Sequence, residues 1–161
     1  MTIDGKPLRG SVDHFEDRKA VHLLSAFCFD KQLILGHLET DEKSNEIPAV
    51  PCLIEELKLN NCVFTLDAMH CQKKTVELLS TTNNHLIVQV KGNQKTLLEA
   101  VQNADHLSPM VSTDEQYEHT RNRMTIRDVT VFEGEKVLAK LPDWKELIAS
   151  VIHVERTTDS F

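Results

Sequence analysis

Two aspartates that lie far apart in the chain, Asp4 and Asp67, each follow a short strand-like segment. Residues 62–66 are mostly apolar and run directly into Asp67, before a polar segment that favours a helix. A short apolar run predicts a buried strand, and ligands usually bind at the carboxyl ends of such strands in α/β sheets. If the two strands are neighbours, their carboxylates meet at one edge of the sheet. Paired acids of this kind can hold two divalent cations about 3.5–4 Å apart for phosphoryl transfer.

The simpler alternative for Asp67 is that its side chain only caps the helix that follows. Two aspartates at strand ends are a weak signal for a metal when taken alone. A metal site is still chemically reasonable, because Mg²⁺ prefers oxygen ligands, retains several waters and needs few protein ligands. The eight histidines show no HxH or HExxH spacing, and the four cysteines show no CxxC pair. We therefore predict buried free thiols rather than disulfides or a zinc site.

The segments that must position these aspartates predict a sheet. Residues 1–6 resemble the end of a strand, and two apolar segments around the Asp30-Lys31 turn predict an antiparallel hairpin. Three strands followed by alternating helices and strands predict an α/β fold, with a mixed sheet covered by helices. The predicted strands after the first are 21–29, 32–39, 62–66 and 85–90, and the predicted helices are 47–57, 72–81 and 95–104.

Two prolines affect the helix predicted over residues 47–57, where apolar residues recur at helical spacing. Pro48 falls in the first turn, where proline is tolerated, but Pro51 lies one turn further in, where proline costs about 3 kcal/mol. We expect either a kink at Pro51 or a helix that begins only there. Glu42 and Glu46 are interpreted as acids at a helix start, favoured there by the helix dipole.

The second part of the chain differs in composition. Residues 108–120 are polar and predict a linker, whereas residues 124–132 alternate like a strand and residues 149–156 resemble its partner. We therefore predict two parts: a core over residues 1–104, and a linker with a β-rich segment over residues 105–161.

Length and charge limit the possible functions. The chain has 161 residues, enough for about one domain with a hydrophobic core. Its formal net charge of −7 argues against an extensive phosphate-binding surface, but not against a local basic channel. No apolar run approaches the roughly 20 residues of a membrane helix, and the amino terminus lacks a signal-peptide core. We predict a cytoplasmic protein that does not associate with membranes.

Four segments fall in order at compatible distances: Ile3-Asp4-Gly5-Lys6 with Leu8-Arg9-Gly10, Asp41-Glu42-Lys43-Ser44-Asn45-Glu46-Ile47, Thr65-Leu66-Asp67-Ala68-Met69 with Cys71-Gln72-Lys73, and Lys91-Gly92-Asn93-Gln94. Together they resemble the H-repeat-associated branch of bacterial insertion-sequence transposases. The resemblance covers essentially the whole chain. It implies a ribonuclease H-like fold with an Asp-Asp-Glu catalytic site, and DNA transposition as the function.

By this resemblance, Asp4 is the first catalytic carboxylate and Asp67 is the second, and both bind Mg²⁺ or Mn²⁺. The implied partner is DNA at the ends of an insertion sequence, which is cut and transferred. Lys91 and Asn93 are implied to contact a DNA phosphate beside the site, although a plain turn at Gly92-Asn93 explains them about equally well.

Three arginines, Arg121, Arg123 and Arg127, form the one basic cluster of the sequence. They can contact DNA phosphates, but charges that protect a sheet edge from aggregation explain them nearly as well. Residues 124–156 around them resemble the start of the β-rich insertion of these transposases.

The resemblance implies a third carboxylate on a helix after the β-rich insertion, and the chain ends before such a helix. The family also tends to have a glutamate just before the insertion strand, where this sequence has Thr125, and the nearby acids Glu118 and Asp128 could substitute. The resemblance leads us to expect a derivative truncated at both ends and catalytically inactive. Two alternatives stay open. One is a non-catalytic protein that binds full-length transposase, or its DNA complex, and inhibits it; self-association is a further possible interaction. The other is a stand-alone metal-dependent nuclease.

Overall fold

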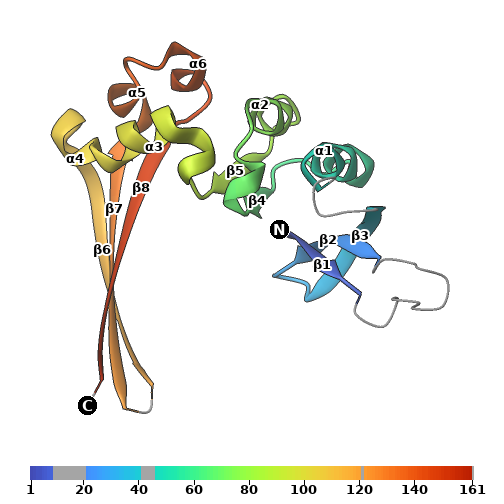
Figure 1. The fold of residues 1–161 in the computed structure, drawn as a ribbon, viewed down its shortest axis with the longest axis horizontal. Coiled ribbons are helices and arrows are strands. Elements are labelled where there is room, and N and C mark those ends of the chain that lie inside the picture. The colour runs from blue at the N-terminus through green and yellow to red at the C-terminus, as the bar shows by residue number, and fades with distance from the viewer. Residues whose placement is uncertain (9–20, 41–45, 121, 161) are drawn as a thin grey trace. The chain divides into compact units, whose positions relative to one another are not determined.

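The computed structural model forms two compact units, residues 1–93 and residues 94–161, each with its own sheet (Figure 1). The predicted boundary at residues 104 and 105 falls inside the second unit, and the division into a core and a β-rich segment stays a prediction. The structure describes residues 1–8, 21–40, 46–120 and 122–160.

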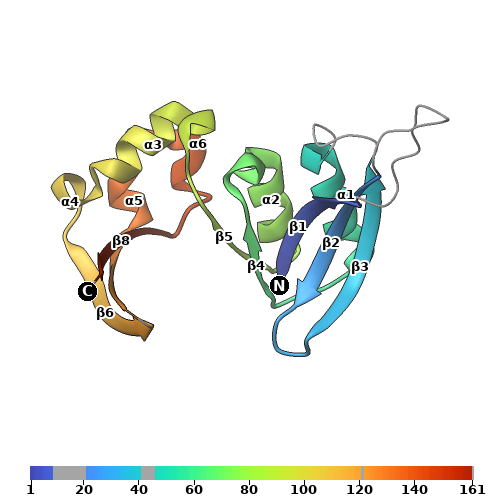
Figure 2. The same cartoon turned by 60° about the horizontal axis from the view of Figure 1, so that its bottom comes forward.

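The first unit contains a five-stranded mixed sheet in the order β3-β2-β1-β4-β5, with β1 between β2 and β4 (Figure 2). β1 pairs antiparallel with β2, and β2 pairs antiparallel with β3. β4 runs parallel to both β1 and β5. This mixed sheet confirms the predicted fold class. The strands are β1 (Thr2–Pro7), β2 (His22–Cys28), β3 (Leu33–Thr40), β4 (Val63–Leu66) and β5 (His85–Val88).

Two helices and a short 3-10 turn accompany this sheet: α1 (Glu46–Leu57), η3 (Ala68–His70) and α2 (Lys73–Thr81). α1 is helical from Glu46 and includes Pro51, so the predicted alternative of a helix beginning at Pro51 is wrong. α1 stays helical despite Pro51 because the apolar residues on its buried face pack in the core against the sheet.

The core of the first unit lies between the sheet and these two helices. Along β4, Phe64 and Leu66 are buried, whereas Val63 is 46% exposed, as expected when alternate side chains point to opposite faces. Burial of each such large side chain stabilises the fold by about 1.5–3 kcal/mol. The buried cluster consists of Ile3, Leu24, Ala26, Ala49, Val50, Leu53, Ile54, Phe64, Leu66 and Leu79.

One buried asparagine fixes the start of β4 beside β5. The Asn84 Oδ1 atom accepts a hydrogen bond from the Cys62 backbone at 3.0 Å, and its Nδ2 atom donates to the Leu59 carbonyl at 2.8 Å. Asn84 lies three residues after the end of α2 at Thr81. The strand that leads to Asp67 is therefore held at its beginning by a side chain as well as by the sheet.

The second unit contains a three-stranded antiparallel sheet in the order β6-β7-β8. A 3-10 turn, η4 (Gly92–Gln94), leads from β5 toward α3. The predicted strands at 124–132 and 149–156 are confirmed as parts of β7 and β8. The elements of this unit are α3 (Lys95–Gln102), α4 (Ala104–Leu107), β6 (Met110–Thr120), β7 (Arg123–Glu133), α5 (Gly134–Val137), α6 (Pro142–Lys145) and β8 (Ser150–Ser160).

The predicted linker over residues 108–120 is wrong, because Met110–Thr120 forms β6. Every residue of β6 is exposed, so the strand has no buried face and its sequence lacks the apolar alternation that would identify it. Pairing with β7 supplies its backbone hydrogen bonds instead.

Two further expectations concern cysteines and membranes. The four cysteines are free thiols, but only Cys71 is buried, whereas Cys52 is exposed. Among the described residues, no helix is both long enough and apolar enough to cross a membrane.

Candidate active site

The parallel pairing of β1 with β4 brings the chain segments that carry Asp4 and Asp67 next to one another. Thr2 lies opposite Thr65 in this pair, and Asp4 and Asp67 each follow two residues later in the chain. The Thr2 and Thr65 hydroxyls are 2.8 Å apart, which puts both on the same face of the sheet. Because side chains alternate with a period of two, Asp4 and Asp67 project from that face as well. Adjacent strands are about 4.7–4.9 Å apart, so the segments that carry the two aspartates run next to one another at this point.

One detail of this arrangement differs from the expectation. Asp4 lies within β1 rather than at its end, because residues 5–7 continue to pair with β2. Asp67 follows the last residue of β4, as predicted.

Asp67 caps the turn that follows it. Its Oδ1 atom accepts a hydrogen bond from the Ala68 backbone at 2.7 Å, and the Lys91 Nζ atom is 3.6 Å from the same oxygen. The Ala68 N–H lowers the pKa of Asp67 most strongly, burial opposes this with a smaller effect, and Lys91 lowers the pKa further. Asp67 therefore does cap the following turn, as the simpler alternative predicted. Its carboxylate is nevertheless ionised and lies at the surface.

Lys91 and Asn93, predicted as DNA-binding residues, both lie beside Asp67. Asn93 Nδ2 donates a hydrogen bond to the Ala68 carbonyl at 2.9 Å, which holds the loop after Asp67. Asp4 has a similar neighbour, because the Lys6 Nζ atom is 3.5 Å from its Oδ2 atom. Both ion pairs are exposed and contribute little to stability.

The first unit contains buried polar side chains whose burial was not predicted from the sequence. Glu46 and His70 are only 3% and 2% exposed, and His22 Nδ1 lies 4.0 Å from Glu46 Oε1. Burial lowers the pKa of His70, although the charges of Glu46 and Asp67 partly oppose this shift. Four buried atoms have no hydrogen-bond partner among the described residues: His22 Nδ1, Thr40 Oγ1, Glu46 Oε1 and His70 Nδ1.

The arginines and acids predicted as site residues in the second unit do not form a recognisable catalytic cluster among the described residues. Arg121 lies outside the described residues. Arg123 is exposed on β7, and the Arg127 Nη2 atom donates to Glu118 Oε2 at 3.0 Å. Glu118, one candidate for a third acid, is therefore paired with an arginine. Within the described ranges, no three His, Cys, Asp or Glu side chains are arranged to hold a metal ion.

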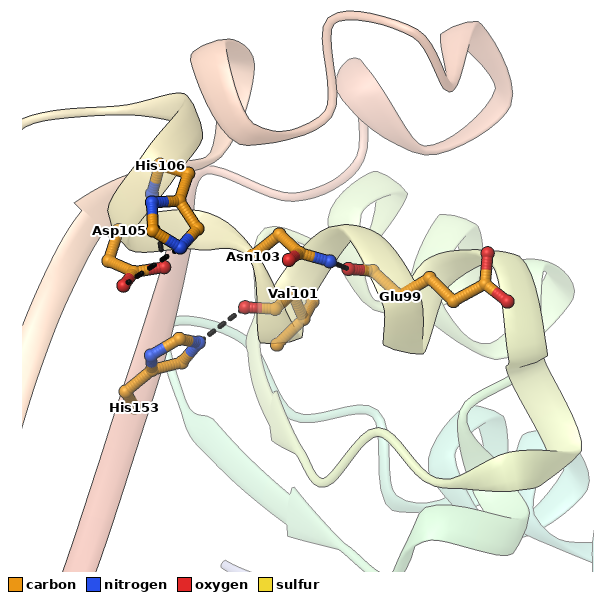
Figure 3. Close-up of polar contacts among 6 residues, drawn as sticks. All are labelled: Glu99, Val101, Asn103, Asp105, His106 and His153. Carbon is orange, nitrogen blue, oxygen red and sulfur yellow. Dashed lines mark hydrogen bonds and ion pairs between the residues drawn. The ribbon is translucent and has the colours of Figure 1, made fainter.

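The second unit also has a shallow cavity of about 570 Å³ beside β7 and β8. Its lining includes Asp105, Asp128, the other candidate acid, and His153. Figure 3 shows that His153 contacts the Val101 carbonyl, which joins β8 to α3. These contacts explain how the helices of this unit are held on its sheet.

Comparison with known proteins agrees with this geometry. The sequence model described as "Transposase DDE domain" matches residues 2–148. The chain belongs to this family. Its five-stranded mixed sheet fits the ribonuclease H-like fold of DDE transposases, which generally use divalent metal ions and act on DNA.

Named relatives agree with the family assignment. "H repeat-associated putative transposase YhhI" of Escherichia coli is 42% identical over 100 residues, which are 62% of this chain and 26% of the relative. "Uncharacterized protein in dhlA 3'region" of Xanthobacter autotrophicus is 30% identical over 152 residues, which are 91% of this chain and 50% of the relative. The chain spans about a quarter of the length of the E. coli relative. No solved structure matches the chain.

Proposed function

We propose that this DDE-family chain contributes Asp4 and Asp67 to a site for metal-dependent DNA strand cleavage and transfer. The observation that supports this most directly is the parallel pairing of Thr2 with Thr65, because Asp4 and Asp67 each follow two residues later on these neighbouring strands. Two exposed carboxylates provide the oxygen ligands that Mg²⁺ or Mn²⁺ prefers. When bound, such cations supply an activated hydroxyl and neutralise charge on the reacting phosphate.

The residues around the aspartates have distinct roles in this proposal. The Ala68 N–H and the Asn93 side chain hold Asp67 in place. Lys91 balances the charge of Asp67 and is close enough to contact a DNA phosphate beside it. On β7, the exposed Arg123 and the partly buried Arg127 are further candidates for phosphate contacts.

The proposal also includes the DNA substrate, the cellular location and the expected rate of cleavage. We infer insertion-sequence ends as the DNA and the bacterial cytoplasm as the location, by analogy with the H-repeat-associated relatives. The third carboxylate that the family resemblance implies has no assigned residue in this proposal, and Thr125 replaces the glutamate that the family tends to have before the insertion strand. We therefore expect slow strand cleavage by this chain alone.

Nicking of supercoiled plasmid by the purified chain in Mn²⁺ tests the proposal. We expect nicking that Asp4→Ala and Asp67→Ala abolish, whereas Asp30→Ala, a change at an exposed turn, leaves it intact. Equal nicking by Asp67→Ala and wild type would refute the assignment. Absence of nicking, together with inhibition of an intact transposase, would favour a non-catalytic partner instead.

A further inference from the structure

The sheet of the second unit has one end without helices. Figure 1 shows α3 to α6 gathered at one end of β6, β7 and β8, whereas the other end extends away from them. At that end, the Thr125 and Thr158 hydroxyl oxygens are 3.4 Å apart, so these two side chains share a face. Because side chains alternate along a strand, Arg123 and Arg127 on β7 and Arg156 on β8 project from the same face. We call the surface of these three arginines the basic face.

The charges of the basic face are only partly balanced. Arg127 lies opposite Arg156 in the β7–β8 ladder, and like charges opposite one another on one face are unfavourable. Glu118, on β6, accepts a hydrogen bond from Arg127 at 3.0 Å and balances one charge. Arg123 and Arg156 are exposed, and no described residue forms an ion pair with either. Two of the three positive charges are therefore available to an anionic partner.

The opposite face of the same strands is acidic. Glu115, Asp128 and Glu155 lie opposite one another in a single row across the three strands. Asp128 follows Arg127 and Glu155 precedes Arg156, so alternation puts these acids on the face away from the arginines. Asp128 and Glu155 also line the cavity of this unit together. A polyanion is therefore attracted to one face of the sheet and repelled by the other.

A role in protecting the sheet edge does not account for the basic face. β8 is an edge strand of this sheet, but β7, which carries Arg123 and Arg127, is the central strand. These two arginines are four residues apart on β7, which is about 13 Å at the usual rise of a strand. Phosphates of one DNA strand recur about every 3.4 Å along the duplex axis, so this span covers about four nucleotides.

We propose that the basic face binds the phosphate backbone of duplex DNA and that Arg156 is one of its phosphate contacts, an inference that rests on the proposed function. Arginine suits this partner because its guanidinium donates paired hydrogen bonds to phosphate oxygens. The acidic row on the reverse side fixes which face of the sheet is turned toward the DNA.

DNA binding by the full chain tests this assignment without using cleavage. Fluorescence anisotropy of a labelled duplex of arbitrary sequence is followed against salt concentration, with EDTA present. We expect Arg156→Gln to weaken binding about threefold to tenfold at low salt and to reduce the slope of log K against log salt by about 0.9. Arg156→Lys keeps the charge and should retain the slope. Glu155→Gln changes the net charge equally on the opposite face and should leave the slope as in wild type.

The outcomes separate this inference from the proposed function. Arg156→Gln that binds DNA like wild type, while Lys91→Gln binds it more weakly, would overturn the inference and leave the proposed function standing. Equal and opposite effects of Arg156→Gln and Glu155→Gln would show that only net charge matters, which also overturns it. So would a change in oligomeric state on size exclusion without a change in DNA binding, because the basic face would then meet a second copy. Nicking that depends on Asp67 decides the proposed function separately.

Discussion

Two substitutions at Asp67 separate its contribution as a cap from its negative charge. Alanine removes both, whereas asparagine keeps a side-chain oxygen that can accept the hydrogen bond from Ala68 N, 2.7 Å long in the native protein. We expect Asp67→Ala to lower the free energy of unfolding by about 1 kcal/mol, the usual value of such a cap. Asp67→Asn should remain within about 0.5 kcal/mol of wild type, because the exposed ion pair with Lys91 contributes little.

The assay is urea unfolding followed by circular dichroism at pH 7 in metal-free buffer, with Asp30→Ala as the control. Equal destabilisation by alanine and asparagine would refute the cap as the source of the loss. Plasmid nicking should not distinguish the two substitutions, since both remove the charge and should abolish nicking. Nicking that survives in Asp67→Asn would show that the reaction does not need this carboxylate.

The pH dependence of stability provides a further check on Asp67. Its pKa in the folded chain is lowered from 3.8, first by the Ala68 N–H and then by Lys91. The stability that its ionised form contributes is therefore present above the unfolded pKa and is lost as the pH falls through the folded value. Asparagine does not titrate, so wild type should lose stability relative to Asp67→Asn when unfolding is measured from pH 5 downward. A difference that stays constant over this range would contradict the charge contribution.

Two further substitutions test the packing around the site and in the second unit. Asn93→Ala removes the hydrogen bond to the Ala68 carbonyl and should cost about 1 kcal/mol in urea unfolding; unchanged stability would show that the loop after Asp67 is held by other contacts. Gly134→Ala would place a Cβ atom 2.1 Å from the Ile148 carbonyl oxygen, and we expect a loss of about 1–3 kcal/mol. Gly92→Ala meets no atom within 4 Å and is the control, so equal losses at both glycines would contradict the steric argument.

The strands of the first unit could be predicted from sequence because their burial leaves an apolar pattern. Residues 62–66 become β4 almost as expected, with Phe64 and Leu66 in the core. The position of Asp67 follows from that strand alone. Its partnership with Asp4 depends on which strands are neighbours, and this was predicted from family resemblance rather than from any local pattern.

The features that sequence did not reveal depend on tertiary contacts. β6 has no buried face, and so no periodic pattern marks it. The burial of Glu46 results from the packing of α1 against β1 at a glycine, and a charged residue at a helix start normally indicates an exposed cap. Asp4 was expected to end its strand because a glycine follows it, but Gly5 continues the pairing with β2.

The fully exposed strand β6 has a consequence for how this part of the chain can evolve. Substitutions at exposed positions away from special contacts usually change stability by no more than about 0.5 kcal/mol. Residues of β6 can therefore vary widely while the backbone ladder with β7 persists, whereas β4, whose alternate residues fill a core, tolerates few replacements. Sequence divergence among relatives should accordingly be fast along β6 and slow along β4.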